Sequence, residues 1–219
     1  MLDALMRKYG SDKADHGYCE FYEGHFAPIR ESVKAFLEIG VFKGASARAW
    51  LDYFPVARVL GLDDGHFRAK WSFGTDRAQV YIGDQGARSS LKVVAGDNPG
   101  GFDIVLDDGS HTMWGQQVSL AGLLPSVKTG GLYVLEDLHT SFSPVVGYRW
   151  PNGVLYGYAT GCDFPLTTTH EVLSKWPDVK SDYMTQDEWD YCVAHVGKVE
   201  IFDRDNDKKH MTAVLEVAK

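Results

Sequence analysis

The chain has few cysteines, no long apolar run and a shortage of basic residues. Its three cysteines, Cys19, Cys162 and Cys192, are an odd number without metal-type pairing, so the sequence predicts no disulfide framework. No stretch approaches the roughly 18 consecutive apolar residues of a membrane-spanning helix. The start of the chain lacks the apolar segment of a signal peptide. These absences favour a reducing cytoplasm as the location of the protein and give no sign of a membrane partner.

The charge balance is acidic, with 22 Lys and Arg against 30 Asp and Glu and a formal net charge of −8. Nucleic-acid backbones are bound mainly by Lys and Arg, so this balance argues against a nucleic-acid partner. Of the 219 residues, 44% are hydrophobic, and there is no internal repeat or Pro-rich linker. Size and composition therefore predict a single α/β domain over residues 1–219.

Short apolar runs alternate with helical patterns from Ala35 onward. The runs are bounded by Gly or Asp, as expected of strands buried on both faces of a parallel sheet. They are AFLEI (35–39), RVLGL (58–62), AQVYI (78–82), FDIVL (102–106) and GLYVLE (131–136). Between them, Ala45–Tyr53 and Met113–Leu124 have apolar residues at helical spacing. The alternation predicts right-handed crossovers and a doubly wound sheet.

The chain changes character after Leu138. From there to about Asp187 it is rich in Tyr, Trp, Pro, Gly and Thr and has no clear period, which is typical of a lid or binding loop. We therefore expect a substrate lid over residues 138–195, which ends in a helix at Gln186–His195. Its aromatic residues suit stacking on a sugar ring or packing into a small core of the lid itself. They are Tyr148, Trp150, Tyr156, Tyr158 and Trp176.

Both ends of the chain complete this architecture. The runs KVEIFDR (198–204) and MTAVLEV (211–217) flank a polar turn and predict an antiparallel pair that closes the sheet. Residues 1–34, with Gly10, Ser11 and Asp12 between helical pieces, predict an N-terminal cap.

The first strand runs into the pattern E-x-G-x-x-x-G, formed by Glu38, Gly40 and Gly44. Glycine is needed at such a turn because a side chain would block the approach of the backbone to a ligand. The pattern differs from the G-x-G-x-x-G of dinucleotide binders. Alone it is equally consistent with a plain tight turn between strand and helix.

The next two strands end in further polar residues. Asp63 and Asp64 follow the second strand, at a position where an acidic side chain can accept both ribose hydroxyls. Asp84 and Gln85 follow the third strand. A single Asp at such a place is more often a turn or cap residue. Polar signals at three successive strand ends favour an adenosine site.

The fourth and fifth strands end in carboxylates, Asp107 and Asp108 in one and Glu136 and Asp137 in the other. Neighbouring parallel strands lie about 4.8 Å apart, so these groups should crowd together and raise one another's pKa. A divalent cation would neutralise them, and an all-oxygen set favours Mg²⁺, Mn²⁺ or Ca²⁺ over zinc. The alternative is that the Asp residues cap helices while Glu136 pairs with an Arg.

His111 lies three residues after Asp108, so one helical turn would bring its ring to the same pocket. A neutral imidazole suits the removal of a proton from a hydroxyl near neutral pH. The rival role for His111 is that of a metal ligand. His139 is expected to lie in the loop rather than to line the substrate pocket.

With these residues assembled, the sequence resembles the macrocin and mycinamicin O-methyltransferase group, enzymes that methylate sugar hydroxyls of macrolide antibiotics. The matching segments are KYGSDK (8–13), HGYCEFYEGHFAPIR (16–30), LEIGVFKGAS (37–46), VLDDGSH (105–111) and GGLYVLED (130–137). The group implies a Rossmann-like class I methyltransferase fold, which is α/β with a mostly parallel seven-stranded sheet and an antiparallel last strand. It also implies S-adenosylmethionine as methyl donor, Mg²⁺ and a homo-oligomer.

By this resemblance, Asp108, Glu136 and Asp137 are the magnesium ligands and His111 is the general base. In the cofactor site, Glu38 and Gly40 would lie near the methionine part. Asp63 would bind the ribose, and Asp84 with Gln85 would lie by the adenine. Ser11 belongs to the KYGSDK segment, which helps to close that site.

The resulting hypothesis is an S-adenosylmethionine- and Mg²⁺-dependent O-methyltransferase that acts on a sugar hydroxyl. Its acceptor is a small molecule or an oligosaccharide: a glycosylated natural product or a polysaccharide precursor. The nearest alternative is a catechol-type metal-dependent O-methyltransferase. A non-catalytic module that binds S-adenosylmethionine is a third reading, and the glycine spacing argues against a nicotinamide oxidoreductase.

Overall fold

In the computed structural model, the described residues are 1–141, 148–149, 155–156, 167–204 and 210–218. Seven strands within these ranges form one sheet in the order β3-β2-β1-β4-β5-β9-β8. They are β1 (Ala35–Ile39), β2 (Arg58–Asp63), β3 (Ala78–Ile82), β4 (Phe102–Asp107), β5 (Val127–Leu135), β8 (Val196–Asp203) and β9 (Met211–Val217). The short strands β6 (Tyr148–Arg149) and β7 (Leu155–Tyr156) pair separately.

The first five strands of the sheet are parallel to one another. Strand β9 is antiparallel to both β5 and β8, between which it lies. The predicted sheet, including its closing antiparallel pair, is therefore confirmed. Strand β5 begins earlier than the predicted run, because Val127 already pairs with Phe102 before an irregularity in the register.

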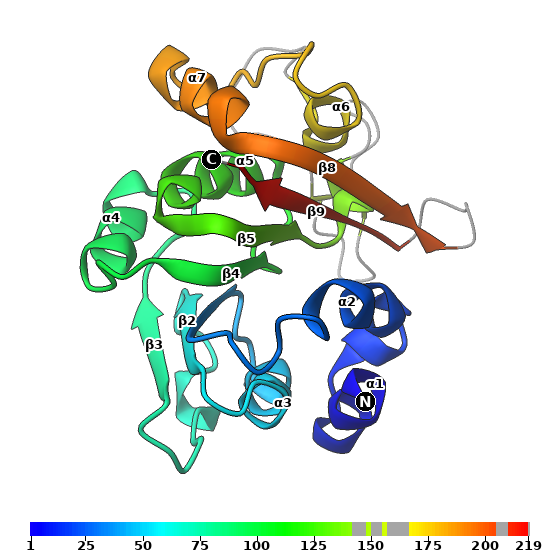
Figure 1. Cartoon of the computed structure of the whole chain (residues 1–219), viewed down its shortest axis with the longest axis vertical. Coiled ribbons are helices and arrows are strands. Elements are labelled where there is room, and N and C mark those ends of the chain that lie inside the picture. Colours follow the sequence, from blue (N-terminus) through cyan, green and yellow to red (C-terminus); the bar gives the residue numbers. More distant parts are fainter. Residues whose placement is uncertain (142–147, 150–154, 157–166, 205–209, 219) are drawn as a thin grey trace.

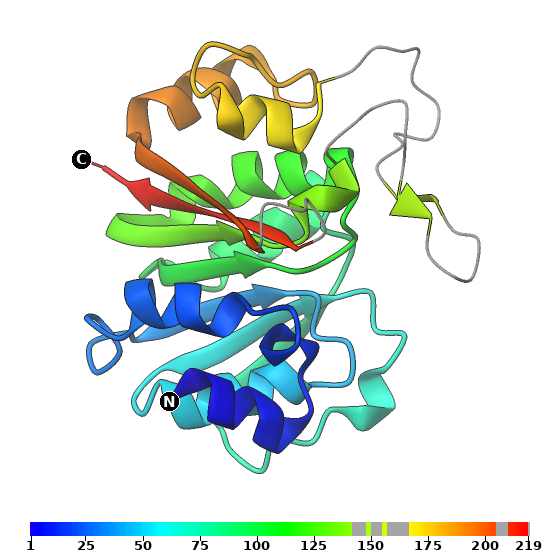
Figure 2. The same cartoon turned by 90° about the vertical axis from the view of Figure 1, so that its right-hand side faces the viewer.

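Helices cover both faces of the sheet (Figures 1 and 2). They are α1 (Leu2–Tyr9), α2 (Tyr18–Phe26), α3 (Ala45–Tyr53), α4 (Arg88–Gly96), α5 (Met113–Leu123), α6 (Thr169–Ser174) and α7 (Gln186–His195). Figure 1 shows α1, α2 and α3 on one side and the remaining helices on the other. The predicted N-terminal cap is thus two helices joined by a 3₁₀ turn at Asp12–Ala14.

Alternate residues of each buried strand serve two separate hydrophobic cores. In β1, Phe36 packs into the core beneath α1–α3, whereas Leu37 packs into the core beneath α4–α7. The Phe36 ring lies 4.9 Å from Trp50 and 5.2 Å from Phe54, between ring centroids. Both faces of the strand are buried, which explains why its sequence is a continuous apolar run.

The part of the chain predicted as a lid has two portions. Residues 167–195 form a packed helical layer, in which α6 and α7 place Val172 and Trp189 in the core. The ring of Trp176 lies 4.9 Å from that of Trp189, so Trp176 packs against the core. Trp150 and Tyr158 lie outside the described residues, and the lid remains a prediction for the segment around them.

Strand register places the ends of the central strands side by side. Ile39 pairs with Leu62 in β2 and with Asp107 in β4, and Asp107 pairs with Leu135 in β5. The loops that carry the predicted site residues therefore leave the sheet at one edge, its carboxyl-terminal edge. No helix among the described residues has the length and apolar character needed to cross a membrane.

Candidate active site

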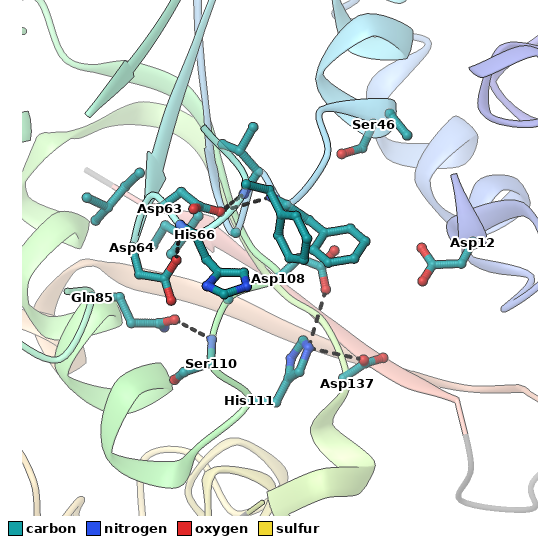
Figure 3. Close-up of a pocket in the computed structure, with 18 of the residues that line it drawn as sticks. Asp12, Ser46, Asp63, Asp64, His66, Gln85, Asp108, Ser110, His111 and Asp137 are labelled. Carbon is teal, nitrogen blue, oxygen red and sulfur yellow. Dashed lines mark hydrogen bonds and ion pairs between the residues drawn. The ribbon is translucent and has the colours of Figure 1, made fainter. Parts of the chain in front are cut away.

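A cavity of about 1040 Å³ opens at the carboxyl-terminal edge of the sheet (Figure 3). Its walls come from the N-terminal segment 10–16, from the turns after β1, β2 and β3, and from the loop 108–112. Eight of the sequence-predicted site residues line it: Ser11, Gly40, Asp63, Asp84, Gln85, Asp108, His111 and Asp137. Glu38 and Glu136 do not line this cavity.

The turn after β1 depends on a glycine at position 40. Gly40 has a φ of 86°, and a Cβ built on it would lie 2.0 Å from the carbonyl oxygen of Asp108. The backbone N–H of Asp108 in turn donates to the carbonyl of Ile39 at 2.9 Å. Gly40 therefore lets the backbone of the turn after β1 contact the backbone of the DDGSH loop (residues 107–111). A residue with a Cβ would prevent this contact.

Asp63 holds the same turn from the side of β2. Its Oδ2 accepts from the backbone N–H groups of Val41 and Phe42, both at 2.9 Å, and its Oδ1 accepts from Gly65 at 2.8 Å. An ionised carboxylate has about four lone-pair sites, so most of those of Asp63 are already used. The adjacent Asp64 also lines the cavity and accepts one bond, from His66 N–H at 2.8 Å.

Gln85 supports the DDGSH loop from the end of β3. Its Nε2 donates to both oxygens of Asp107, at 3.0 and 3.2 Å, and its Oε1 accepts from the Ser110 N–H at 2.5 Å. Asp107 is fully buried and also accepts from the Ser119 hydroxyl. Burial raises the pKa of Asp107 to about 6, although these hydrogen bonds lower it. Asp107 is thus a buried anchor of the loop. Asp84, by contrast, lines the cavity, and its Oδ1 accepts from the Gly86 N–H at 2.8 Å.

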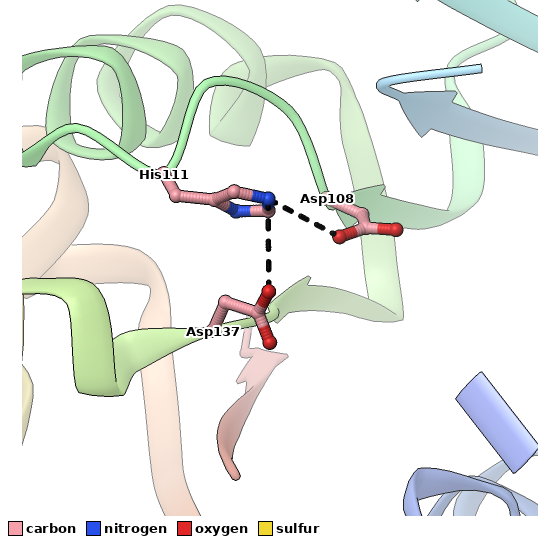
Figure 4. A group of neighbouring side chains, drawn as sticks. All are labelled: Asp108, His111 and Asp137. Carbon is pink, nitrogen blue, oxygen red and sulfur yellow. Dashed lines mark ion pairs between the residues drawn. The ribbon is translucent and has the colours of Figure 1, made fainter. Parts of the chain in front are cut away.

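Asp108, His111 and Asp137 form a group that could hold a metal ion (Figure 4). One donor atom from each lies within 4.8 Å of the others. His111 Nε2 is 3.9 Å from Asp108 Oδ1 and 3.6 Å from Asp137 Oδ2. His111 and Asp137 have positive φ values of 53° and 55°, a conformation that costs about 1–2 kcal/mol for a residue with a Cβ. Both strained residues carry a donor of this group, as expected where the fold must aim side chains at one point.

Lys13 is a site residue that sequence reasoning missed. It lies on the 3₁₀ turn between α1 and α2, is 1% exposed, and donates to Asp108 Oδ2 and, at 3.0 Å, to Glu136 Oε2. Its Nζ is 3.9 Å from Glu38 Oε1. Burial alone would lower the pKa of Lys13, but the three carboxylates raise it well above its ordinary value. The KYGSDK segment was the available signal, although an isolated Lys normally indicates a surface position.

Glu38 and Glu136 are buried in the protein behind this lysine. Glu38 Oε1 accepts from the Trp50 indole at 3.1 Å, and burial raises the pKa of Glu38 to about 7. Burial and the neighbouring Asp108 raise the pKa of Glu136 well above its usual range, against the opposing effect of Lys13. Glu38 Oε2 and Glu136 Oε1 are buried and have no hydrogen-bond partner among the described residues.

The charge count favours a cation at this place. Glu38, Asp108, Glu136 and Asp137 bring four carboxyl groups together beside the Lys13 ammonium, and burial raises the pKa of Glu38, Asp108 and Glu136, as expected of buried acids that lack enough positive charge nearby. Buried carboxylates without a partner are strongly disfavoured, so the cluster can gain from a further positive charge. The oxygen-rich donor set and the partnerless Glu136 Oε1 both fit a hard divalent ion.

The N-terminal segment and two histidines surround Asp137. The hydroxyl of Tyr18 donates to Asp137 Oδ1 at 2.8 Å, and His139 Nδ1 is 3.9 Å from the same oxygen. Burial would raise the pKa of Asp137, but His111, His139 and Tyr18 hold it below its ordinary value. His139 lies on the 3₁₀ turn Leu138–Ser141 beside this carboxylate and is not among the residues that line the cavity, in keeping with the loop position that the sequence favours. Tyr18 had no local signal, because its partner lies 119 residues away.

The sheet order and the antiparallel β9 are those of class I methyltransferases, so the fold class predicted from the sequence is confirmed. One matching solved structure is the MycE methyltransferase of the mycinamycin biosynthetic pathway in complex with Mg, SAH and mycinamycin VI. The TM-score is 0.74 at 27% sequence identity, and the match covers 100% of this chain and 54% of that one.

Curated proteins give the same likeness, although no protein-family model matches the chain. The chain is 37% identical over 155 residues to the 8-demethyl-8-(2-methoxy-alpha-L-rhamnosyl)-tetracenomycin-C 3'-O-methyltransferase of Streptomyces olivaceus. This match covers 67% of this chain and 39% of that protein. It is equally similar, at 37% over 155 residues, to the mycinamicin VI 2''-O-methyltransferase of Micromonospora griseorubida, with 67% and 38% covered. The chain thus spans about two fifths of the length of these relatives. The resemblance drawn from the motifs is borne out.

Gly40→Ala should destabilise the protein beyond the cost of its backbone conformation, because the new Cβ would collide with the Asp108 carbonyl. Gly130→Ala is the matched control. Gly130 has a φ of 76°, but among the described residues nothing beyond its chain neighbours lies within 4 Å of the position that a Cβ would take. The control should lose about 1–2 kcal/mol of unfolding free energy, and Gly40→Ala should lose more, as measured by urea denaturation. Equal losses in the two variants would contradict the backbone contact between turn and loop.

Proposed function

We propose that this chain is an S-adenosylmethionine- and Mg²⁺-dependent O-methyltransferase that acts on a sugar hydroxyl of a glycosylated natural product. The observation that carries the proposal is the cavity shared by the glycine turn and by the group Asp108, His111 and Asp137. A methyl donor and a metal-oriented hydroxyl could meet there. The relatives named for sugar positions on tetracenomycin and mycinamicin support the acceptor class.

The cofactor half of the cavity would be formed by the turn after β1 and by the ends of β2 and β3. Gly40 gives backbone access, and Asp63 fixes the turn through its bonds to Val41 and Phe42. Asp64 has more acceptor capacity left than Asp63, which makes it a second candidate for the ribose hydroxyls. Asp84 and Ser11 both line the cavity, where Asp84 would lie by the adenine and Ser11 would help to close the site from the N-terminal segment.

The metal half would be held by Asp108 and Asp137, with Glu136 as the predicted third carboxylate. Bound there, a divalent cation would supply Lewis acidity and orient an acceptor with neighbouring hydroxyls. S-adenosylmethionine would supply the methyl group, and His111 would receive the proton that the acceptor hydroxyl loses. Asp137 Oδ2 lies 3.6 Å from His111 Nε2 and would help to orient the ring.

The wider setting of this activity also belongs to the proposal. We infer a homo-oligomer in the cytoplasm, because the resemblance implies the first and the cysteine usage favours the second. The predicted substrate lid over residues 138–195, part of which lies outside the described residues, would contribute to acceptor binding.

Metal dependence and acceptor class can be tested together. With S-adenosylmethionine present, the protein should methylate glycosylated macrolide or tetracenomycin acceptors in Mg²⁺, and EDTA should abolish turnover until Mg²⁺ is restored. Methyl transfer from labelled cofactor is the measurement, with a catechol panel alongside. Full activity in demonstrably metal-free protein, or turnover confined to catechols, would contradict the proposal.

His111→Ala should lower kcat by about 10²–10⁴, the usual contribution of a general base. The variant should also lose the acid limb of the pH–rate profile, because that limb reports protonation of the imidazole. Cofactor binding should stay near the wild-type value, as measured by calorimetry. If excess Mg²⁺ restored the wild-type kcat, His111 would instead be a metal ligand.

Comparison of Asp63→Ala with Asp64→Ala locates the ribose contact. Removal of the residue that accepts the ribose hydroxyls should weaken cofactor binding by about 1.5–3 kcal/mol, the usual contribution of hydrogen bonds to a charged group. Asp63→Ala should in addition lower the thermal stability of the metal- and cofactor-free protein, because the turn amides of Val41 and Phe42 lose their acceptor. An unchanged dissociation constant in both variants would place the ribose elsewhere.

A further inference from the structure

The ammonium group of Lys13 occupies the interior of the carboxylate cluster. Three carboxylates surround it: Asp108 and Glu136 as hydrogen-bond acceptors, and Glu38 at 3.9 Å. Its side chain is 1% exposed, and those of Glu38 and Glu136 are equally buried. Lysine is very rarely buried to this degree unless it is paired. Its charge therefore supports this cluster rather than the surface of the protein.

Asp108 is shared between this lysine and the candidate metal group. One of its oxygens, Oδ2, accepts from Lys13, whereas Oδ1 faces His111 Nε2 at 3.9 Å. The side chain of Asp108 is 21% exposed and lines the cavity, so it lies at the boundary between the buried lysine and the open site. A divalent ion bound by Asp108 and Asp137 would stand close to a desolvated ammonium, and like charges at such distances repel strongly.

The turn that carries Lys13 is held by the rest of the fold. Ser11 N–H donates to the Met6 carbonyl at 2.9 Å, and Arg204 donates to the Asp15 carbonyl at 2.5 Å. The same segment contributes Ser11, Asp12, His16 and Lys13 itself to the wall of the cavity. Lys13 is thus a fixed charge on a segment that also encloses the site.

We propose that Lys13 is a resident counter-ion that competes with the divalent cation for the carboxylate of Asp108. In the metal-free protein it keeps the buried carboxylates together, and it weakens metal binding to a level at which the ion exchanges. This inference rests on the proposed metal site. Lys13 is accordingly a positioning residue, which acts on the reaction through Asp108 and Glu136.

The consequence is a link between metal loading and the N-terminal segment. When the ion takes a share of Asp108, Lys13 keeps Glu136 and the nearby Glu38 as its partners. The hydrogen bond from Lys13 to Asp108, which is a buried contact between segment 10–16 and the DDGSH loop, then weakens. Ordering of the cavity wall and occupancy of the metal site are therefore coupled, as linkage requires for two events that share one group.

Two variants remove the charge of Lys13 in different ways. Lys13→Met keeps the apolar length of the side chain, and Lys13→Gln keeps a hydrogen-bond donor. Lys8→Met is the matched control, because Lys8 lies on the adjoining helix α1 but pairs with Asp52 at the surface, where its side chain is 57% exposed. The measurements are the Mg²⁺ dissociation constant by calorimetry, a Mn²⁺ titration by electron paramagnetic resonance, and the Tm of the metal-free protein.

Both Lys13 variants should bind Mg²⁺ at least about fivefold more tightly than the wild type, the lower end of usual coupling between sites. Their metal-free Tm should fall below that of the control, and Mg²⁺ should raise it by more than it raises the wild-type Tm. Unchanged or weaker Mg²⁺ binding in both variants would overturn the competition. So would variants that stay unfolded with and without Mg²⁺, because Lys13 would then serve the fold alone. Failure of the wild type and both variants to bind any divalent ion would instead refute the proposed metal site.

Discussion

Negative charge buried at the ends of the central strands is the constraint on which the rest of the site depends. Removing a carboxylate from water costs several kcal/mol unless the protein supplies partners. Three of the carboxylates here have partners of their own: Gln85 and Ser119 for Asp107, the Trp50 indole for Glu38, and Tyr18 for Asp137. Asp108 and Glu136 share Lys13, and burial raises the pKa of both, which shows that one ammonium group does not fully compensate them. A site of this kind selects a small, hard, multivalent cation by charge density before any ligand geometry is considered.

The sheet register produces this concentration of charge. Ile39, Leu62, Asp107 and Leu135 lie in register, so the loops that follow them begin at nearly the same height above the sheet. Parallel strands make the same edge the end of each, and open α/β sheets use that edge for ligands. The proposed cofactor half and the proposed metal half of the site adjoin because β1 lies between β2 and β4. The contact between Gly40 and the Asp108 carbonyl joins the two halves directly.

Local sequence was sufficient for the strands and for most of the cavity wall. A buried parallel strand is a short apolar run, and the polar residue that ends it must reach the common edge, so Asp63, Asp84 and Asp108 could be placed from the sequence. What a side chain does at that edge was harder to predict. Asp63 accepts hydrogen bonds from backbone amides, and Lys13 is a buried partner of Asp108. Contacts between segments distant in the sequence determine both sets of hydrogen bonds. No periodicity reports such contacts, and the lysine that pairs with Glu136 likewise comes from a segment 123 residues away in the sequence.

The N-terminal segment and strand β9 hold each other across nearly the whole length of the chain. Tyr22 and Thr212 share a hydrogen bond of 3.1 Å between their hydroxyls, and Tyr18 also approaches the Met211 carbonyl. Strand β9 follows every other strand of the sheet in the sequence, yet it inserts between β5 and β8. During synthesis, Tyr18 and Tyr22 therefore leave the ribosome long before the strand against which they dock. The apolar surface of the early helices that these contacts cover stays open until then, and contacts so distant in sequence form more slowly than local ones.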